Sequence, residues 1–400
     1  MNSKDGLFMT RASLAFLGAK YFVILFFLLF SCKNSPRDKS ATETIPLSNI
    51  GNKNLSEIVE EVSYVVLKNP NKAFVQVDKM FVVDENLIVV DLFGMQSLLQ
   101  FDRQGNFLNT IGKLGEGPEE YLNTIDVAYS HDEKLIEILS TKGIIQYGLD
   151  GKYNSRVELE SRPHRFLKID PSRYIFYIPE VMASELREGY GKDILYSFEV
   201  KSKKLSPLLE PIFPEVLNFM GDKNNLFHFG NQVIFSSSFC DTIYLISPNA
   251  EKKKLFLNFG SSQIDLSKLY NLSAYQLVDQ INGENLRQKS LHVPHLFYNE
   301  RYLTSSFLKD RSFHFFVYDL RNKTTYLSSR MKNDLDSGPG LGVIKMMDKE
   351  YIYSVFEPEE LIQHARNLDP NSKKRNDSFL NLVENLSNDD FLVVAKYKLK

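Results

Sequence analysis

Short runs of β-branched and aromatic residues repeat along the chain from residue 62 onward, and polar turns separate them. The runs are five to nine residues long, and Gly, Asn, Asp and Lys fill the turns between them. This spacing predicts strands along most of the chain. Taken in fours, the strands give a repeat of roughly 45–60 residues, which is the range of β-propeller blades.

Six such units can be delimited. They are Val77–Gly112, Thr124–Leu159, His164–Pro211, Asn225–Gly260, His292–Ser329, and a last unit made of Gly342–Glu357 and Phe391–Leu399. The last unit lacks a fourth strand, whereas Val62–Leu67 has no unit of its own. We therefore expect Val62–Leu67 to complete the sixth unit, because this closure removes an open sheet edge. The predicted fold is an all-β, six-bladed β-propeller closed by an N-terminal strand.

Two segments interrupt the strand pattern. Residues 265–290 and 358–387 are polar, and their leucines recur at helical spacing. We expect both segments to be helical insertions in a propeller domain that covers residues 55–400.

The first thirty residues have the pattern of an export signal. Tyr21–Phe30 is an apolar run of about ten residues that follows Arg11 and Lys20. This length suits the core of a signal peptide, whereas a membrane span needs roughly 20 residues. Leu29–Cys32 resembles a bacterial lipobox, so we expect residues 1–31 to be cleaved before Cys32 and Cys32 to carry lipid. The alternative is a plain N-terminal anchor helix with an incidental cysteine.

The residues that follow the signal predict an anchored envelope protein. Residues 32–54 are polar and read as a flexible tether between the lipid and the domain. The expected location is the cell envelope, with the outer membrane favoured. Lipidation of Cys32 leaves Cys240 as the one remaining cysteine, and we expect it to be buried in a strand as a small apolar residue.

Composition and charge exclude several classes of function. The 400 residues contain 48 Lys and Arg against 50 Asp and Glu, so no basic excess exists for binding nucleic acid. Two cysteines are too few for a disulfide-stapled scaffold.

Three segments carry a family resemblance: Ile111–Tyr121 (IGKLGEGPEEY), Asp241–Tyr244 (DTIY) and Lys396–Lys400 (KYKLK). With them, the chain from about residue 55 to residue 400 resembles the six-bladed β-propeller lipoproteins of Bacteroidetes, whose blades are similar to NHL repeats. Glu119 stands where that family usually has Gly. The resemblance implies the fold and the envelope location, and it implies no particular activity.

The first of these segments reads as a structural motif. Its expected structural residues are Gly112, Gly115, Gly117, Pro118, Glu119 and Tyr121. The glycines relieve steric crowding where the chain crosses between blades, and Pro118 fixes φ. Tyr121 can pack between blades. A phosphate-binding or cation-binding loop is the alternative, but no Gly-Lys-Ser/Thr sequence follows.

The sequence offers candidate ligand-binding residues in the central channel, and it assigns no catalytic, cofactor-binding or metal-binding residue. His292 and His295 form the one close histidine pair, but residues three apart in a strand point to opposite faces. Polar residues near the expected inner strands are the candidates for binding a ligand: Asp78, Asp126, His164, Arg165, His228, His295 and Lys345.

These observations favour a monomeric, lipid-anchored propeller that binds or scaffolds a protein, peptide or glycan and needs no cofactor. The alternative is a divalent-metal-dependent hydrolase or a lactonase or lyase that acts in the channel. An enzyme would need carboxylates that converge with a histidine or a metal, whereas a binding protein would need an exposed aromatic patch. Phe239, Tyr298 and Tyr302 are the candidates for such a patch.

Overall fold

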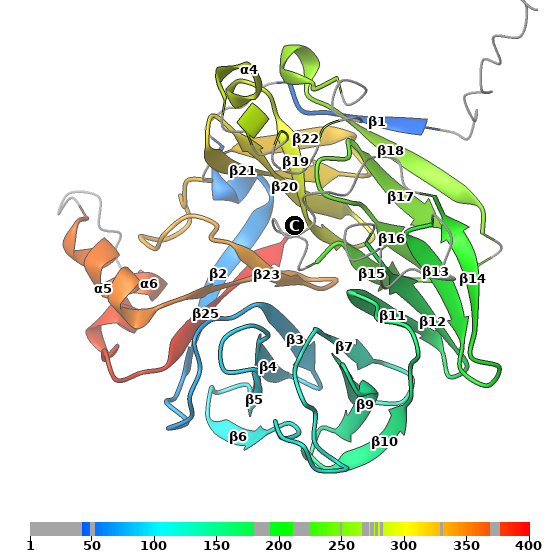
Figure 1. Cartoon of the computed structure of the whole chain (residues 1–400). Helices are drawn as coiled ribbons and strands as arrows, with labels where there is room; N and C mark the ends of the chain where they lie inside the picture. Colours follow the sequence, from blue (N-terminus) through cyan, green and yellow to red (C-terminus); the bar gives the residue numbers. More distant parts are fainter. Residues whose placement is uncertain are drawn as a thin grey trace, which may run out of the picture. The chain divides into compact units, whose positions relative to one another are not determined.

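The computed structural model describes residues 42–48, 53–179, 193–210, 224–248, 250–265, 272, 276, 279–280, 283–328, 331–368 and 377–400. The predicted signal peptide, Cys32 and residues 33–41 and 49–52 of the predicted tether lie outside these residues. The described strands form six sheets arranged in a ring (Figure 1). The predicted six-bladed β-propeller is therefore confirmed.

Each blade contains four antiparallel strands, which we count from the inside of the ring outward. Blade one contains β3 (Lys79–Val83), β4 (Asn86–Asp91), β5 (Ser97–Phe101) and β6 (Phe107–Thr110). Blade two contains β7 (Asp126–Ser130), β8 (Leu135–Ser140), β9 (Gly143–Gly148) and β10 (Tyr153–Val157). Blade three contains β11 (Arg165–Asp170), β12 (Arg173–Tyr177), β13 (Leu195–Glu199) and β14 (Lys204–Leu209).

The remaining three blades repeat this order. Blade four contains β15 (Leu226–Phe229), β16 (Gln232–Phe235), β17 (Thr242–Ile246) and β18 (Lys252–Asn258). Blade five contains β19 (Leu291–Tyr298), β20 (Tyr302–Lys309), β21 (Ser312–Asp319) and β22 (Thr324–Ser328). Blade six contains β23 (Ile344–Met347), β24 (Tyr351–Phe356), β25 (Leu392–Leu399) and β2 (Val59–Leu67).

The hydrophobic core is divided into layers between neighbouring blades. One buried cluster joins Ile88 and Val90 of blade one to Ile136 and Ile138 of blade two, and corresponding clusters lie at the other five boundaries. Both faces of a blade are therefore buried, which explains why a central strand such as β4 (NLIVVD) is apolar at consecutive positions.

The N-terminal strand closes the ring as predicted. β2 pairs with β25 along its whole length, from Val59 opposite Leu399 to Leu67 opposite Leu392. The first and last strands of the propeller thus share one sheet, which leaves β25 with a partner on both sides.

A further strand lies within the segment that the sequence predicts as a tether. β1 (Thr42–Pro46) adds a fifth strand to blade four, beside β18 (Figure 1). Ile45 and Leu47 are buried in the core between blades four and five, and their neighbours Thr44 and Pro46 are exposed. The pattern contains only two apolar residues, so it does not stand out from a polar linker.

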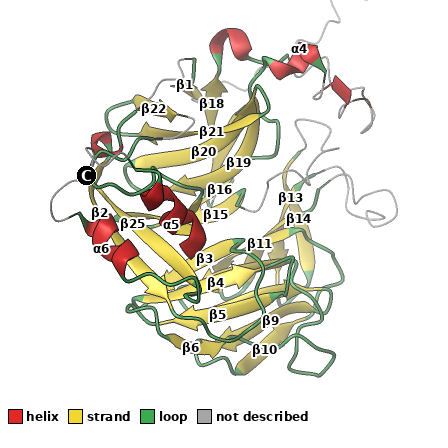
Figure 2. Cartoon of the chain, turned by 90° about the vertical axis from the view of Figure 1, so that its left-hand side faces the viewer, coloured by secondary structure: helices red, strands yellow, loops and turns green. Residues whose placement is uncertain are grey.

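The second predicted insertion is helical and supports blade six. α5 (Pro358–Arg366) and α6 (Ser378–Glu384) lie between β24 and β25, and Figure 2 shows them against the sheet. Leu361 and Phe379 pack with Val393 and with Tyr64 and Val66 of β2. In the first insertion, α4 (Glu284–Arg287) is helical, and much of residues 266–282 lies outside the described part. No helix in the described ranges is long and apolar enough to cross a membrane.

The two ends of the blades differ in the length of their connections. At one end, the turns between strands one and two and between strands three and four contain two to five residues; we call this the hairpin face. At the other end lie the connections between blades and between strands two and three, which include both insertions; we call this the long-loop face. Because long connections carry most binding surfaces, the long-loop face is the place to look for function.

Candidate functional site

Polar side chains at the beginnings of the inner strands link neighbouring blades around the channel. Lys79 Nζ lies 2.5 Å from Asp126 Oδ1 and 3.2 Å from the Val127 carbonyl oxygen in blade two. The other oxygen of Asp126 accepts the N–H of Phe166 in blade three at 3.3 Å. Asp126 is 1% exposed, so this candidate channel residue holds blades together instead of facing solvent.

Three more channel candidates make contacts of the same kind. Arg165 donates to a backbone carbonyl of blade two at 3.3 Å, and Lys345 donates to the Val77 carbonyl at 2.6 Å. His295 Nε2 contacts the Ile344 carbonyl of blade six. The structure places these residues around the channel as the sequence suggests, but their polar groups contact the backbone of the neighbouring blade.

The two remaining histidine candidates lie on different blades. His164 precedes β11 and is half-buried, and its backbone N–H donates to the Tyr177 carbonyl at 2.8 Å. His228 is exposed on β15. Partial burial lowers the pKa of His228, and the nearby His131 lowers it further, so the neutral form of the ring is favoured.

The described residues contain no group of three or more His, Cys, Asp or Glu side chains that could hold a metal ion. His292 and His295 do not converge, because His292 contacts the carbonyl of Cys240 in blade four whereas His295 contacts blade six. The alternative of a metal-dependent enzyme therefore finds no support in this part of the chain.

His292 and Cys240 belong to the core. His292 is 1% exposed, and its Nδ1 lies 2.8 Å from the Cys240 carbonyl oxygen. Because a carbonyl only accepts, Nδ1 carries the proton, and the Ser305 hydroxyl can donate to Nε2 at 2.9 Å. Burial lowers the pKa of His292 to about 4. Cys240 is buried as expected, although it lies in the loop between β16 and β17 and not in a strand.

The three aromatic residues proposed from the sequence do not form an exposed patch. Phe239 is 4% exposed and Tyr302 is 1% exposed. Tyr298 is half-buried against Phe229, with their ring centroids 4.9 Å apart. This expectation was wrong because the local sequence does not distinguish an exposed ring from one that is buried by residues distant along the chain.

The long-loop face presents a different group of exposed apolar residues. We call it the apolar cluster, and it consists of Val75, Phe93, Met95, Leu114 and Leu122, each 44–58% exposed. These residues come from three connections around blade one: 68–78 precedes it, 92–96 lies within it, and 111–125 leads from it to blade two. A side chain at Gly94 would meet Val75 Cβ at 2.6 Å, so Val75 packs directly on the loop that carries Phe93 and Met95.

Two buried carboxylates fix the loop of residues 92–96. Asp78, another channel candidate, accepts the N–H groups of Leu92 at 2.8 Å and Phe93 at 3.3 Å. Asp91 accepts the N–H groups of Gly94 at 2.7 Å and Met95 at 2.9 Å. Because the backbone of the loop is held at four successive residues, Phe93 and Met95 are presented in a defined position.

The glycine-rich motif holds the other side of the same loop. The Tyr121 hydroxyl donates to the Gln96 carbonyl at 2.8 Å, and the Thr124 hydroxyl donates to the Leu92 carbonyl at 2.6 Å. Tyr121 is 1% exposed and lies in the core between blades one and two. The motif thus contributes to the support of the apolar cluster.

The acidic residues of the motif make local structural contacts. Glu120 accepts the N–H of Gly117 at 2.9 Å and pairs with Lys113 at 2.6 Å. The hydrogen bond with Lys113 lowers the pKa of Glu120. The carbonyl groups of Pro118 and Glu119 accept from Arg156 at 2.5 Å and Tyr147 at 2.7 Å. Gly112 has φ +68°, and a side chain there would meet the Tyr147 ring at 2.8 Å.

Sequence reasoning did not identify the apolar cluster, although a signal was present. The turn between β4 and β5 reads Leu92-Phe93-Gly94-Met95-Gln96, so it places two large apolar residues where polar turn residues are usual. Leu92 in this turn still enters the core between blades one and two, whereas Phe93 and Met95, on either side of Gly94, stay exposed.

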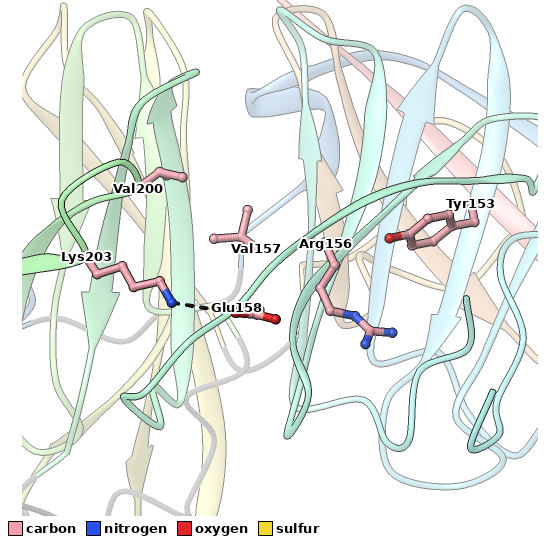
Figure 3. A pocket seen from close by; sticks show the side chains of 6 residues that line it. All are labelled: Tyr153, Arg156, Val157, Glu158, Val200 and Lys203. Carbon is pink, nitrogen blue, oxygen red and sulfur yellow. Dashed lines mark ion pairs between the residues drawn. The ribbon is translucent and has the colours of Figure 1, made fainter. Parts of the chain in front are cut away.

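An open depression lies between blades two and three and is a weaker candidate for binding. It is lined by Tyr153, Arg156, Val157, Glu158, Val200 and Lys203 (Figure 3). Lys203 and Glu158 form an ion pair of 3.6 Å across it, and both side chains are largely exposed. All six lining residues are exposed or only partly buried, so the depression offers little to fix a small ligand.

Comparison with known families identifies the chain. The profile of the family described as "Domain of unknown function (DUF4934)" matches residues 42–398. The chain belongs to the DUF4934 family. This match begins at β1, so the family domain includes the strand added to blade four. No curated protein matches the sequence.

The fold of this DUF4934 protein is also found in a solved structure of another protein. The crystal structure of a Bacteroides fragilis protein predicted to be exported is 17% identical, with a TM-score of 0.72, and the match covers 89% of this chain and 99% of that one. A member of the DUF4221 family from Bacteroides vulgatus is 11% identical, with a TM-score of 0.49, over 86% of this chain and 97% of that one. The first of these supports the propeller assignment.

Proposed function

We propose that this DUF4934 protein is a lipid-anchored, monomeric binding module of the cell envelope with NHL-like blades, and that its apolar cluster binds a protein partner. The observation that carries the binding function is the exposure of Phe93 and Met95 on a loop that two buried carboxylates hold in place. The lipobox at Cys32 supports the anchor, and the likeness to a Bacteroides fragilis protein predicted to be exported supports the envelope location.

The chemistry of the cluster favours a protein or peptide over a glycan. Aliphatic and thioether side chains outnumber the single aromatic ring, and phenylalanine and methionine are enriched at the centres of protein interfaces. A loop with a fixed backbone loses little conformational entropy on binding, so each exposed apolar group can contribute fully to affinity. Large apolar side chains that are exposed together usually mark such a contact.

Site-specific photo-crosslinking in the native envelope tests this proposal. A benzophenone side chain placed at position 93 is expected to capture one discrete partner, whose mass distinguishes protein from glycan. The matched control is position 108, because Leu108 lies on β6 of the same blade and is 49% exposed but outside the cluster.

A second variant connects the crosslink to the cluster. Met95→Ser removes an exposed side chain and leaves the buried contacts of Asp91 in place, so the crosslink at position 93 should weaken while the thermal stability stays unchanged. Equal capture at positions 93 and 108 would show that the apolar cluster is not the binding surface.

A further inference from the structure

The hairpin face carries an uneven distribution of charge. Residues 199–204 of blade three and 251–254 of blade four contain six lysines and two glutamates. We call these lysines the lysine sector: Lys201, Lys203, Lys204, Lys252, Lys253 and Lys254. They lie in or beside the turns β13–β14 and β17–β18, which belong to neighbouring blades.

On the same face, the preceding blades one and two carry the opposite charge. The turns of blades one and two contain six acidic residues and three basic ones: Asp84, Glu85, Asp102, Asp132, Glu133 and Asp150 against Arg103, Lys134 and Lys152. The positive charge is therefore concentrated on one side of the hairpin face, not spread over it.

The N-terminal strand begins beside the lysine sector. Glu43 of β1 lies 3.1 Å from Lys253 and also pairs with Lys323 in the turn between β21 and β22, while the N–H of Leu47 donates to the Asn258 carbonyl at 2.7 Å. β1 therefore runs in the same direction as β18, from the hairpin face toward the long-loop face. The N-terminal end of β1 consequently lies at the hairpin face.

The chain between the proposed lipid and β1 is short. Ten residues separate Cys32 from Glu43, and the eleven steps between their Cα atoms span at most about 40 Å when the chain is fully extended. Residues 33–41 contain Lys33, Arg37 and Lys39 against Asp38, so this linker is also positively charged.

We propose that the lysine sector docks the hairpin face on the surface of a bilayer that contains anionic phospholipids. The inference rests on the proposed lipid anchor, because the anchor brings this face within reach of the headgroups. Lysines next to a membrane are attracted to anionic lipids, and a lipid anchor together with a basic patch holds a protein more firmly than either does alone. The docked orientation turns the long-loop face and its apolar cluster away from the membrane.

The six lysines outnumber the four glutamates beside them, so the sector has a net positive charge; these glutamates are Glu43, Glu158, Glu199 and Glu251. Lys203 pairs with Glu158 at 3.6 Å, and Glu43 is shared between Lys253 and Lys323. Exposed pairs of this kind are weak and are readily exchanged for other anions. The acidic side of the hairpin face is repelled by the same headgroups, which favours one tilt of the ring.

Vesicle sedimentation tests this docking. The chain from residue 33 onward retains every described residue and cannot be lipidated. At low ionic strength it should bind vesicles of about half phosphatidylglycerol and should not bind vesicles of phosphatidylcholine alone. The variant Lys201→Gln/Lys204→Gln/Lys252→Gln is expected to bind the anionic vesicles at least about tenfold more weakly.

The control is Arg103→Gln/Lys134→Gln/Lys152→Gln, which removes the same charge from blades one and two and should bind like the unaltered chain. Thermal unfolding confirms that both variants are folded. Failure of the unaltered chain to bind anionic vesicles, equal binding to neutral ones, or equal losses in both variants would overturn the inference. These outcomes do not depend on lipidation of Cys32 or on the partner of the apolar cluster.

Discussion

At the scale of single residues, this propeller uses its buried polar side chains mainly as structural links. Asp78 fixes a loop, Asp126 joins blades, and His292 ties blade five to the loop that contains Cys240. Each of these residue types would be equally suited to a ligand site. What distinguishes them is the neighbouring backbone group, which comes from a distant part of the chain.

The buried His292 makes stability depend on pH. Its pKa is about 4 in the folded protein and about 6.5 when the chain is unfolded. Above pH 6.5 both states hold the neutral ring. As the pH falls from 6.5 to 4, the unfolded chain gains a proton that the folded protein does not, so about 3 kcal/mol of the free energy of unfolding should be lost.

Urea titrations at several pH values check this prediction. The variant His292→Gln cannot titrate, so its free energy of unfolding should fall less steeply between pH 6.5 and pH 4 than that of the unaltered protein. If the free energy of unfolding depends on pH in the same way in both proteins over this range, His292 does not have the lowered pKa, whatever the stability of the variant at neutral pH.

At the scale of elements, most of what could be predicted follows from the spacing at which apolar residues recur along the sequence. Strands, blade boundaries and the pairing of residues 62–67 with the last strand follow from runs of apolar residues and from one missing strand. β1 could not be predicted, because Ile45 and Leu47 gain their burial from blades four and five. The roles of Lys345 and His295 were equally hidden, since both depend on carbonyls of the next blade.

Ring closure should carry a large share of the stability. β2 buries Val59, Val62 and Leu67, and each such side chain contributes roughly 1.5–3 kcal/mol. Deleting residues 55–67 should therefore abolish cooperative thermal unfolding, since the loss of about 5 kcal/mol or more approaches the whole stability of a domain. Circular dichroism during heating measures this effect.

Leu67→Ala weakens the same strand without removing it. Leu67 is fully buried between blades six and one, so the variant should stay folded and lose about 2–5 kcal/mol of the free energy of unfolding. An unchanged melting temperature in the deletion variant would show that β2 does not close the ring.

At the scale of the whole molecule, the two faces of the ring have different chemistry. The long-loop face carries the apolar cluster, and the hairpin face carries the lysine sector and receives the N-terminal strand. This division suits a protein that stands on a surface and binds on the side facing away from it.

The anchor itself can be tested in cells. Cys32→Ala removes the thiol that would receive lipid, so the protein should move from the membrane fraction to the soluble envelope fraction. Immunoblotting of both fractions measures the change, and Cys240→Ala serves as the control because that thiol is buried. Membrane retention of the Cys32 variant after washing at high salt would refute lipid anchoring.

The pairing of β2 with β25 also has a consequence for the order of events during synthesis. Because the sheet of blade six contains both the first and the last strands of the ring, it cannot be completed until residue 399 has emerged. Blades one to five can form earlier, but the N-terminal strand must wait without its partner. A chain that is threaded through a membrane from its N-terminus would therefore remain incomplete until translocation ends, and the closed ring would assemble only on the far side.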